Sequence, residues 1–185
     1  MPREFETILT LKKTTEKIIM KIQTKDLVIS AMIAAIYVVL TIVFSPISFG
    51  EVQVRIAEAL TILPVFTPCA IPGLFIGCLL GNILGGAVLP DILFGSLATL
   101  LGACGTYLLR SRAKIFWPLP PILANTIIVP LVLRFAYGIL LPVPLLMIYI
   151  AIGEIISCGA LGLGLHALLK SHASALFFPK NKKQN

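Results

Sequence analysis

Long apolar runs, separated by short breaks rich in Pro, Gly and polar residues, occupy the chain between residues 27 and 168. A membrane-spanning helix needs about 20 predominantly apolar residues. The runs are too long for strands and show no alternation of period two, and backbone groups in lipid must be satisfied within their own segment, so helices are predicted. The predicted segments are residues 27–44, 52–66, 70–86, 92–109, 117–137 and 143–169.

The run over residues 52–66 is short and carries charge, so the basic residues decide the number of crossings. Cytoplasmic loops of membrane proteins are enriched in Lys and Arg. With six crossings, both termini and the loop at 110–114 face the cytoplasm, and only Arg55 and Arg134 of the 15 basic residues lie elsewhere. Five crossings would export a basic terminus. We therefore expect an all-α membrane protein, a six-transmembrane-helix bundle in the cell membrane with cytoplasmic N- and C-termini.

This organisation predicts three regions: a basic leader over residues 1–25, a transmembrane domain over 26–169 and a basic tail over 170–185. The leader has no short apolar core followed by a small-residue cleavage site, so it does not resemble a signal peptide. Its apolar residues recur at steps of three and four. That spacing is typical of a helix on the membrane surface, and a solvated segment is the alternative.

Composition supports the bilayer as the solvent and narrows the function. The chain is 58% hydrophobic and 12% charged, against about 45–50% and about 25% in soluble domains. Its net charge of +7 comes from residues at the edges of apolar runs, with no aromatic-interleaved basic stripe, so no nucleic-acid partner is expected. The sequence contains no GxxxxGK[ST], HExxH, GxSxG or CxxC motif. We expect no enzyme activity, catalytic residue, metal or cofactor.

Small residues at four-residue spacing predict close packing of helices, because lipid gives helices little hydrophobic reason to associate. Such a stripe runs through residues 70–86 as Gly73, Gly77, Gly81 and Gly85. A shorter pair, Ala31 and Ala35, lies in the first predicted helix. Alone, this pair carries little information.

Ionisable side chains at bilayer depth are costly unless they are paired or hydrated, so each is a candidate functional residue. Glu51, Arg55 and Glu58 follow one another at i, i+4 and i+7, which is one stripe of an α-helix, with Gln53 beside them. Arg55 can pair with either carboxylate. The stripe is either an interfacial ion pair that anchors a helix end or a charged face of a ligand cavity.

Glu154 lies deep in the last predicted span, with no basic residue near it in sequence. It needs Arg134 or Arg55 from another helix, or a ligand, as its partner. Asn125 follows Pro121 by one turn, where proline loosens a helix. Tyr149 is the one aromatic candidate for ligand contact, because it lies near Glu154 in sequence. The candidate binding residues are Gln53, Arg55, Glu58, Asn125, Arg134, Tyr149 and Glu154.

The blocks VQVRIAEAL and DILFGSLATLL, together with PGLFIGCLLGNILGG, PPILANTIIVP and IAIGEIIS, resemble the QueT family over about residues 27–168. This resemblance implies a substrate-binding (S) component of an energy-coupling-factor (ECF) transporter for queuosine precursors, with a six-helix fold and an outward-opening pocket. S components dock on a transmembrane coupling subunit through small residues of the first helix, and Ala31 and Ala35 match that AxxxA pattern. Two ATPase subunits complete such transporters.

The expected ligand of the family is a 7-deazaguanine base, a deazapurine. A carboxylate can accept hydrogen bonds from its N1–H and exocyclic amine, and a second acid can meet the ammonium of 7-aminomethyl-7-deazaguanine. The resemblance gives these parts to Glu58 and Glu154 without deciding which does which. Arg55 or Arg134 would orient an acid or bind the ring carbonyl, and Asn125 and Gln53 offer both donor and acceptor.

Three other readings remain open. The chain could be an S component for a different vitamin-like substrate. It could be a stand-alone, proton-coupled secondary carrier with Glu154 as the proton relay. It could also be a structural subunit without a ligand, in which the buried charges only pair with one another.

Overall fold

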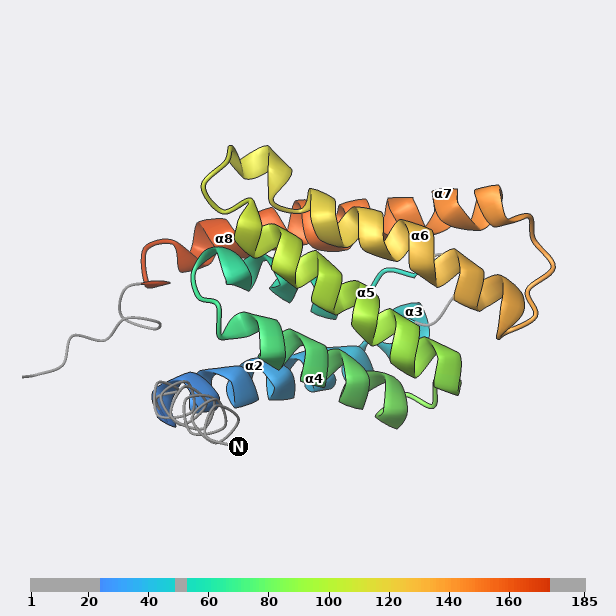
Figure 1. The fold of residues 1–185 in the computed structure, drawn as a ribbon, viewed down its shortest axis with the longest axis horizontal. Coiled ribbons are helices and arrows are strands. Elements are labelled where there is room, and N and C mark those ends of the chain that lie inside the picture. The colour runs from blue at the N-terminus through green and yellow to red at the C-terminus, as the bar shows by residue number, and fades with distance from the viewer. Residues whose placement is uncertain (1–23, 49–52, 174–185) are drawn as a thin grey trace, which may run out of the picture.

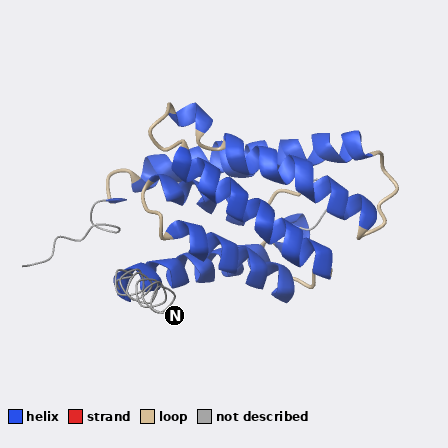
Figure 2. Ribbon diagram, viewed as in Figure 1, coloured by secondary structure: helices blue, strands red, loops and turns tan. Residues whose placement is uncertain are grey.

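The computed structural model of this chain describes residues 24–48 and 53–173. Within these ranges every regular element is a helix, and none is a strand (Figure 2). Most of the predicted leader, Glu51 and most of the basic tail lie outside the described residues. The elements are α2 (Thr24–Val43), α3 (Ser45–Ser48), η1 (Ile56–Val65), α4 (Ala70–Leu84), α5 (Leu89–Leu108), η2 (Lys114–Phe116), α6 (Leu119–Phe135), α7 (Val143–Glu154), η3 (Ile155–Leu161) and α8 (Gly162–Leu169).

The long helices lie side by side along the longest axis of the molecule, and α7, η3 and α8 follow one another as one continuous rod (Figure 1). Four helical stretches are long and apolar enough to cross a membrane: Thr24–Val43, Leu89–Leu108, Lys114–Phe135 and Val143–Leu169. The other two predicted spans are the shorter apolar helices Ile56–Val65 and Ala70–Leu84. The all-helical membrane architecture is confirmed. The predicted number of six crossings is not, because only four of the six segments are long enough to span a membrane by themselves.

The second predicted span differs in kind from the expectation. Residues 53–55 are not helical, Arg55 has an extended backbone (φ −86°, ψ 94°), and η1 is a 3₁₀-helix of 10 residues. A 3₁₀-helix has three residues per turn and rises about 2 Å per residue, so η1 covers only about 20 Å. The prediction that Glu51, Arg55 and Glu58 form one stripe of an α-helix is therefore wrong.

Glycines bring the helix backbones into contact, as the sequence predicts. A Cβ added to Gly73 would lie 2.6 Å from the backbone oxygen of Ser30, and one on Gly77 would lie 2.7 Å from Cβ of Tyr37, so α4 packs directly on α2. A Cβ on Gly102 of α5 would lie 2.6 Å from Cα of Pro121 of α6. Real Cβ atoms do not approach other atoms this closely, so these faces depend on glycine.

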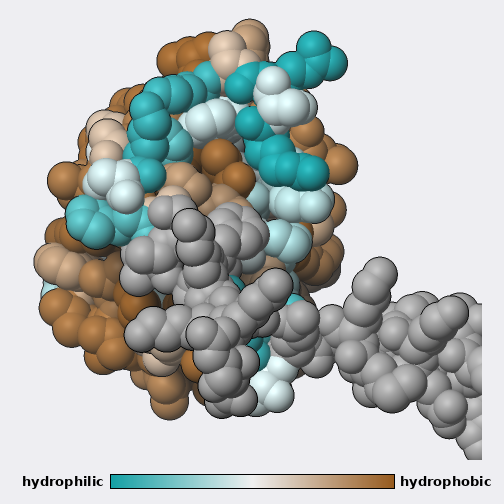
Figure 3. Space-filling model, turned by 90° about the vertical axis from the view of Figure 1, so that its left-hand side faces the viewer, coloured by the Kyte–Doolittle hydropathy of each residue, from teal (hydrophilic) through white to brown (hydrophobic). Residues whose placement is uncertain are grey.

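The distribution of polarity is the reverse of that in a soluble protein. Large apolar side chains such as Phe135 (80% exposed) and Leu140 (88% exposed) face outward, while Glu58, Asn82 and Glu154 are buried. Hydrophilic residues gather at the end where α2 begins and α5 finishes, with Arg110, Arg112 and Lys114 exposed there (Figure 3). An apolar flank with a polar end suits a protein surrounded by lipid.

The packing of α4 on α2 gives a first prediction. Gly77→Ala places a methyl group against Tyr37 and Ala34, and overpacking of this kind costs about 1–3 kcal/mol. We expect the melting temperature of the purified protein in detergent to fall by about 3–10 °C. Gly164→Ala is the matched control, because nothing lies within 4 Å of its added Cβ. An unchanged melting temperature for Gly77→Ala would show that the two helices can separate freely.

Candidate functional site

Glu58, in the first turn of η1, lies at the centre of a buried polar cluster. It is 0% exposed, and its backbone N–H donates to the Arg55 carbonyl in the turn that opens η1 (2.9 Å). Its Oε1 accepts hydrogen bonds from the Tyr37 hydroxyl of α2 (2.5 Å) and the Thr99 hydroxyl of α5 (2.8 Å). Its Oε2 is buried without a hydrogen-bond partner. One oxygen of this carboxyl group is therefore saturated, and the other is available.

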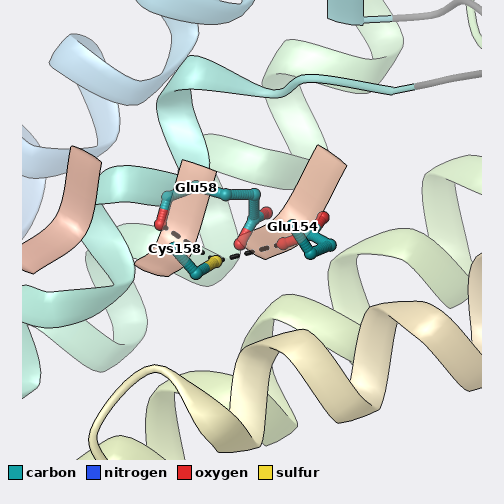
Figure 4. A group of neighbouring side chains, drawn as sticks. All are labelled: Glu58, Glu154 and Cys158. Carbon is teal, nitrogen blue, oxygen red and sulfur yellow. Dashed lines mark hydrogen bonds between the residues drawn. The ribbon is translucent and has the colours of Figure 1, made fainter. Parts of the chain in front are cut away.

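Glu154 ends α7, and the π-helical segment η3 begins at the next residue. It is 2% exposed, and the Cys158 thiol donates to its Oε2 (3.0 Å). Figure 4 shows the Glu58 and Glu154 side chains pointing toward each other, with Cys158 beside them. The two acids are 96 positions apart in the sequence (154 minus 58). The tertiary fold places their carboxyl groups next to each other.

Glu58, Glu154 and Cys158 also form a group of potential metal-ligating side chains in the described part of the chain. One ligand atom from each of Glu58, Glu154 and Cys158 lies within 4.8 Å of the others. Carboxylates and a thiolate are ligand types that divalent transition metals accept. The hydrogen bond from the Cys158 thiol to Glu154 shows that the groups also fit together by direct contact.

Asn125, in the middle of α6, adds an amide to the cluster. It is 1% exposed, and neither its Oδ1 nor its Nδ2 has a hydrogen-bond partner. It is close enough to Glu154 to interact with its carboxyl group. A buried amide without well-aligned partners is costly, so Asn125 is a polar group for which the interior of the bundle provides little beyond Glu154.

Arg55 and Asp91 form an ion pair toward the end of the molecule opposite the basic residues. Arg55 Nη2 lies 3.5 Å from Asp91 Oδ2, and both side chains are almost fully buried. The Tyr137 hydroxyl, from the connection between α6 and α7, donates to the same Asp91 oxygen (3.0 Å). Burial and the Asp91 carboxylate raise the pKa of the Tyr137 phenol above its ordinary value, so it remains a donor.

Other residues predicted for the site have different surroundings. Arg134 is half-buried near the end of α6, and its Nη1 donates to the Ile139 carbonyl (3.0 Å). Tyr149 is half-buried on α7, and no hydrogen bond among the described residues joins it to Glu154. Gln53 is buried, and its backbone carbonyl lies directly against Gly153. Of the predicted set, Glu58, Asn125 and Glu154 come together, with Arg55 near them.

Sequence reasoning missed several members of the cluster. The candidate residues drawn from the sequence did not include Tyr37, Thr99, Cys158 or Asp91. The spacing of four between Glu154 and Cys158 is a signal that places both on one helix face. Tyr37 and Thr99 carry no comparable signal, because their contact with Glu58 depends on how three separate segments pack.

A shallow apolar groove lies between α2 and α4, on the outside of the bundle. Ala31 and Ala35 are exposed in it, flanked by Val39 of α2 and by Ile76 and Leu80 of α4. The small side chains leave the backbone of α2 accessible here. Another helix could approach closely along this line.

The interior cluster has an excess of acidic groups. Among the described residues, the buried Asp, Glu, Lys and Arg side chains are Arg55, Glu58, Asp91 and Glu154. Three carboxyl groups thus face one guanidinium in a region shielded from water. Such a site is suited to a polar or cationic small molecule rather than an anion.

Comparison with known proteins agrees with the description of a helical membrane protein. The model of the QueT transporter family matches residues 27–171. The queuosine precursor transporter QueT of Lactococcus lactis subsp. cremoris is 37% identical over 101 residues, which cover 52% of this chain and 59% of that protein. The alignment thus spans less than two thirds of the relative's length. No solved structure matches the chain.

The family match extends over nearly the whole described helical bundle. It includes the buried residues Arg55, Glu58, Asp91 and Glu154. Its members are transporters rather than enzymes. This multi-pass membrane protein belongs to the QueT transporter family.

Proposed function

We propose that this protein is the substrate-binding membrane subunit of an ECF-type importer and captures a queuosine precursor, a 7-deazaguanine base, from outside the cell. The observation that carries the proposal is the convergence of Glu58 and Glu154, from separate membrane segments, on one buried point. The name of the relative in Lactococcus lactis supports the class of substrate.

The chemistry of a guanine-like base suits this cluster. Its N1–H and exocyclic amine are adjacent donors, which a carboxylate can accept as a strong bidentate pair. Its ring carbonyl is an acceptor that the amide of Asn125 or the guanidinium of Arg55 can meet. Arg134, Gln53 and Tyr149 remain candidates for ligand contact in a conformation in which the cluster is open to the ligand.

We propose that the chain crosses the membrane six times, with η1 and α4 as the two short crossings. Lys25, Arg110, Arg112, Lys114 and Lys170 lie at or near one end of the bundle, and the positive-inside rule makes that end cytoplasmic. Both termini then face the cytoplasm. Arg55, Asp91 and Tyr137 lie toward the opposite, extracellular end, from which the ligand would arrive.

The groove between α2 and α4 is the proposed docking face for the coupling subunit. Ala31 and Ala35 are exposed along it, and small residues let a partner helix approach the backbone of α2. Energy would come from two ATPase subunits of the complex, since this chain has no phosphate-binding loop of the GxxxxGK[ST] type.

The proposed site predicts that charge removal weakens binding of 7-deazaguanine bases. We expect Glu154→Gln and Glu58→Gln each to weaken binding of 7-aminomethyl-7-deazaguanine, measured by calorimetry on purified protein, by about 10-fold or more. Asp26→Asn is the control, because Asp26 lies in the first turn of α2, away from the cluster. Unchanged affinity in both glutamine variants would place the binding site elsewhere.

If the groove between α2 and α4 is the docking face, substitutions in it should impair assembly of the transporter without impairing binding of the base. We expect the double variant Ala31→Leu and Ala35→Leu to lose copurification with the coupling and ATPase subunits while it keeps its affinity for the base. Ala160→Leu, an exposed position on η3, is the matched control and should leave assembly intact. Normal assembly of the double variant would remove the groove between α2 and α4 from the interface.

The source of energy separates the proposed importer from a proton-coupled carrier. We expect uptake of radiolabelled base by cells that express this protein to stop when the ATPase subunits are deleted. A protonophore that leaves ATP levels unchanged should have little effect. Uptake that survives the deletion and collapses with the proton gradient would contradict the ECF assignment and favour Glu154 as a proton relay.

A further inference from the structure

The connection between α5 and α6 carries a dense group of basic side chains. Arg110, Arg112 and Lys114 fall within five consecutive positions, and all three are exposed. The sequence has no Asp or Glu between Asp91 and Glu154, so the connection contains no acid of its own. Like charges this close together repel one another, and a bound anion would offset that repulsion.

Lys170, at the end of α8, adds a fourth positive charge from a distant part of the sequence. Lys114 and Lys170 both lie close enough to His166 of α8 to interact with it electrostatically. Lys170 is exposed, as are the three cations of the connection. We call Arg110, Arg112, Lys114 and Lys170 the basic patch. It lies at the end of the bundle where α5 and α8 finish (Figure 1).

The connection between α5 and α6 has a defined conformation. The ring of Trp117 is buried and packs edge-on against the ring of His166, with centroids 4.9 Å apart. The Trp117 carbonyl accepts a hydrogen bond from the Thr106 hydroxyl (2.9 Å). The Arg110 guanidinium lies 3.8 Å from the centre of the Tyr107 ring, and its Nη1 donates to the Tyr107 carbonyl (3.0 Å). Because these contacts already order the connection, binding of a ligand there loses less conformational entropy.

Large apolar side chains lie beside the basic patch and face outward. Ile115 is 66% exposed and Phe116 is 47% exposed, and both directly follow Lys114 in η2. Cations next to exposed apolar side chains suit the boundary between the phosphates and the acyl chains of a lipid leaflet. A free phosphate ion would meet only the charges and would leave the apolar side chains in water.

We propose that the basic patch and η2 form a binding site for an anionic phospholipid of the leaflet at this end of the bundle. Arg110, Arg112 and Lys114 bind the headgroup phosphate, which a guanidinium can meet with two parallel hydrogen bonds. Ile115 and Phe116 contact the upper part of an acyl chain. The bound lipid fixes the depth of the α5–α6 connection in the membrane. This surface is separate from the buried acids, so the inference does not depend on the identity of the substrate.

Native mass spectrometry of the full chain, purified in an uncharged detergent and titrated with lipid, measures this binding. We expect the affinity for phosphatidylglycerol to exceed that for phosphatidylcholine by about 10-fold or more, since each Lys or Arg adds to the attraction of an anionic headgroup. Higher ionic strength should weaken binding of phosphatidylglycerol, because salt screens exposed charges. Inorganic phosphate at the same concentration should not displace the lipid, because it has no acyl chain.

Charge removal at the connection should abolish the selectivity for the anionic headgroup. For the triple variant Arg110→Gln, Arg112→Gln and Lys114→Gln, we expect affinity for phosphatidylglycerol to fall by about 10-fold or more, with affinity for phosphatidylcholine unchanged. Arg112→Gln alone should lower it by about fivefold, and this variant decides the question if the triple variant has a lower melting temperature without lipid. The matched control removes three positive charges from the basic tail: Lys180→Gln, Lys182→Gln and Lys183→Gln. It should leave both affinities intact.

Removal of the apolar side chains should have a different effect. The double variant Ile115→Ser and Phe116→Ser keeps every positive charge of the basic patch. We expect it to weaken binding of both lipids and to keep the ratio between their affinities. A double variant that binds both lipids as the unaltered protein does would contradict the assignment of η2 to the acyl chain.

Four further results would overturn the proposal. If phosphatidylcholine binds as tightly as phosphatidylglycerol, the site has no preference for an anionic headgroup. If inorganic phosphate displaces the lipid, the patch is a site for a free anion. If the tail variant loses as much affinity as the triple variant of the connection, the lipid responds to net charge alone. If the triple variant keeps its lipid and instead loses copurification with the ATPase subunits, the basic patch is a protein interface.

Discussion

A carboxyl group in the interior of a membrane protein must find hydrogen-bond donors inside the protein, because lipid supplies none. Here Tyr37, Thr99 and Cys158 supply them to Glu58 and Glu154 from three different helical segments. The positions of α2, α5 and the α7–η3 rod relative to η1 are therefore coupled to this cluster. A movement of any of them would change the donors that the two acids retain.

The small residues make that convergence geometrically possible. Gly77 lets α4 lie against α2 at Tyr37, and Gly153 lets α7 lie against the backbone of Gln53, just before η1. With larger residues at these positions the segments would separate, and the short hydrogen bonds to Glu58 could not form. The same glycines that look like generic packing elements in the sequence therefore set the distances within the polar cluster.

The buried cluster combines polar groups that have hydrogen-bond partners with polar groups that have none. A permanent structural ion-pair network would be expected to satisfy its members, as the pair of Arg55 and Asp91 with Tyr137 does in part. Both atoms of the Asn125 amide, one oxygen of Glu58 and one oxygen of Asp91 have no hydrogen-bond partner within the described part of the chain. Buried groups without a partner cost stability and keep their capacity to donate or accept a hydrogen bond.

The sequence by itself determined the helical class, the approximate positions of the long helices and the ionisable residues within apolar segments. It could do so because hydrophobicity along one segment, and the cost of a charge in lipid, are local properties of that segment. Only the tertiary structure decided that η1 is a short 3₁₀-helix, that Asp91 pairs with Arg55, and that Tyr37 rather than Tyr149 contacts an acid. Those outcomes depend on distances between segments far apart in the chain, which no local pattern encodes.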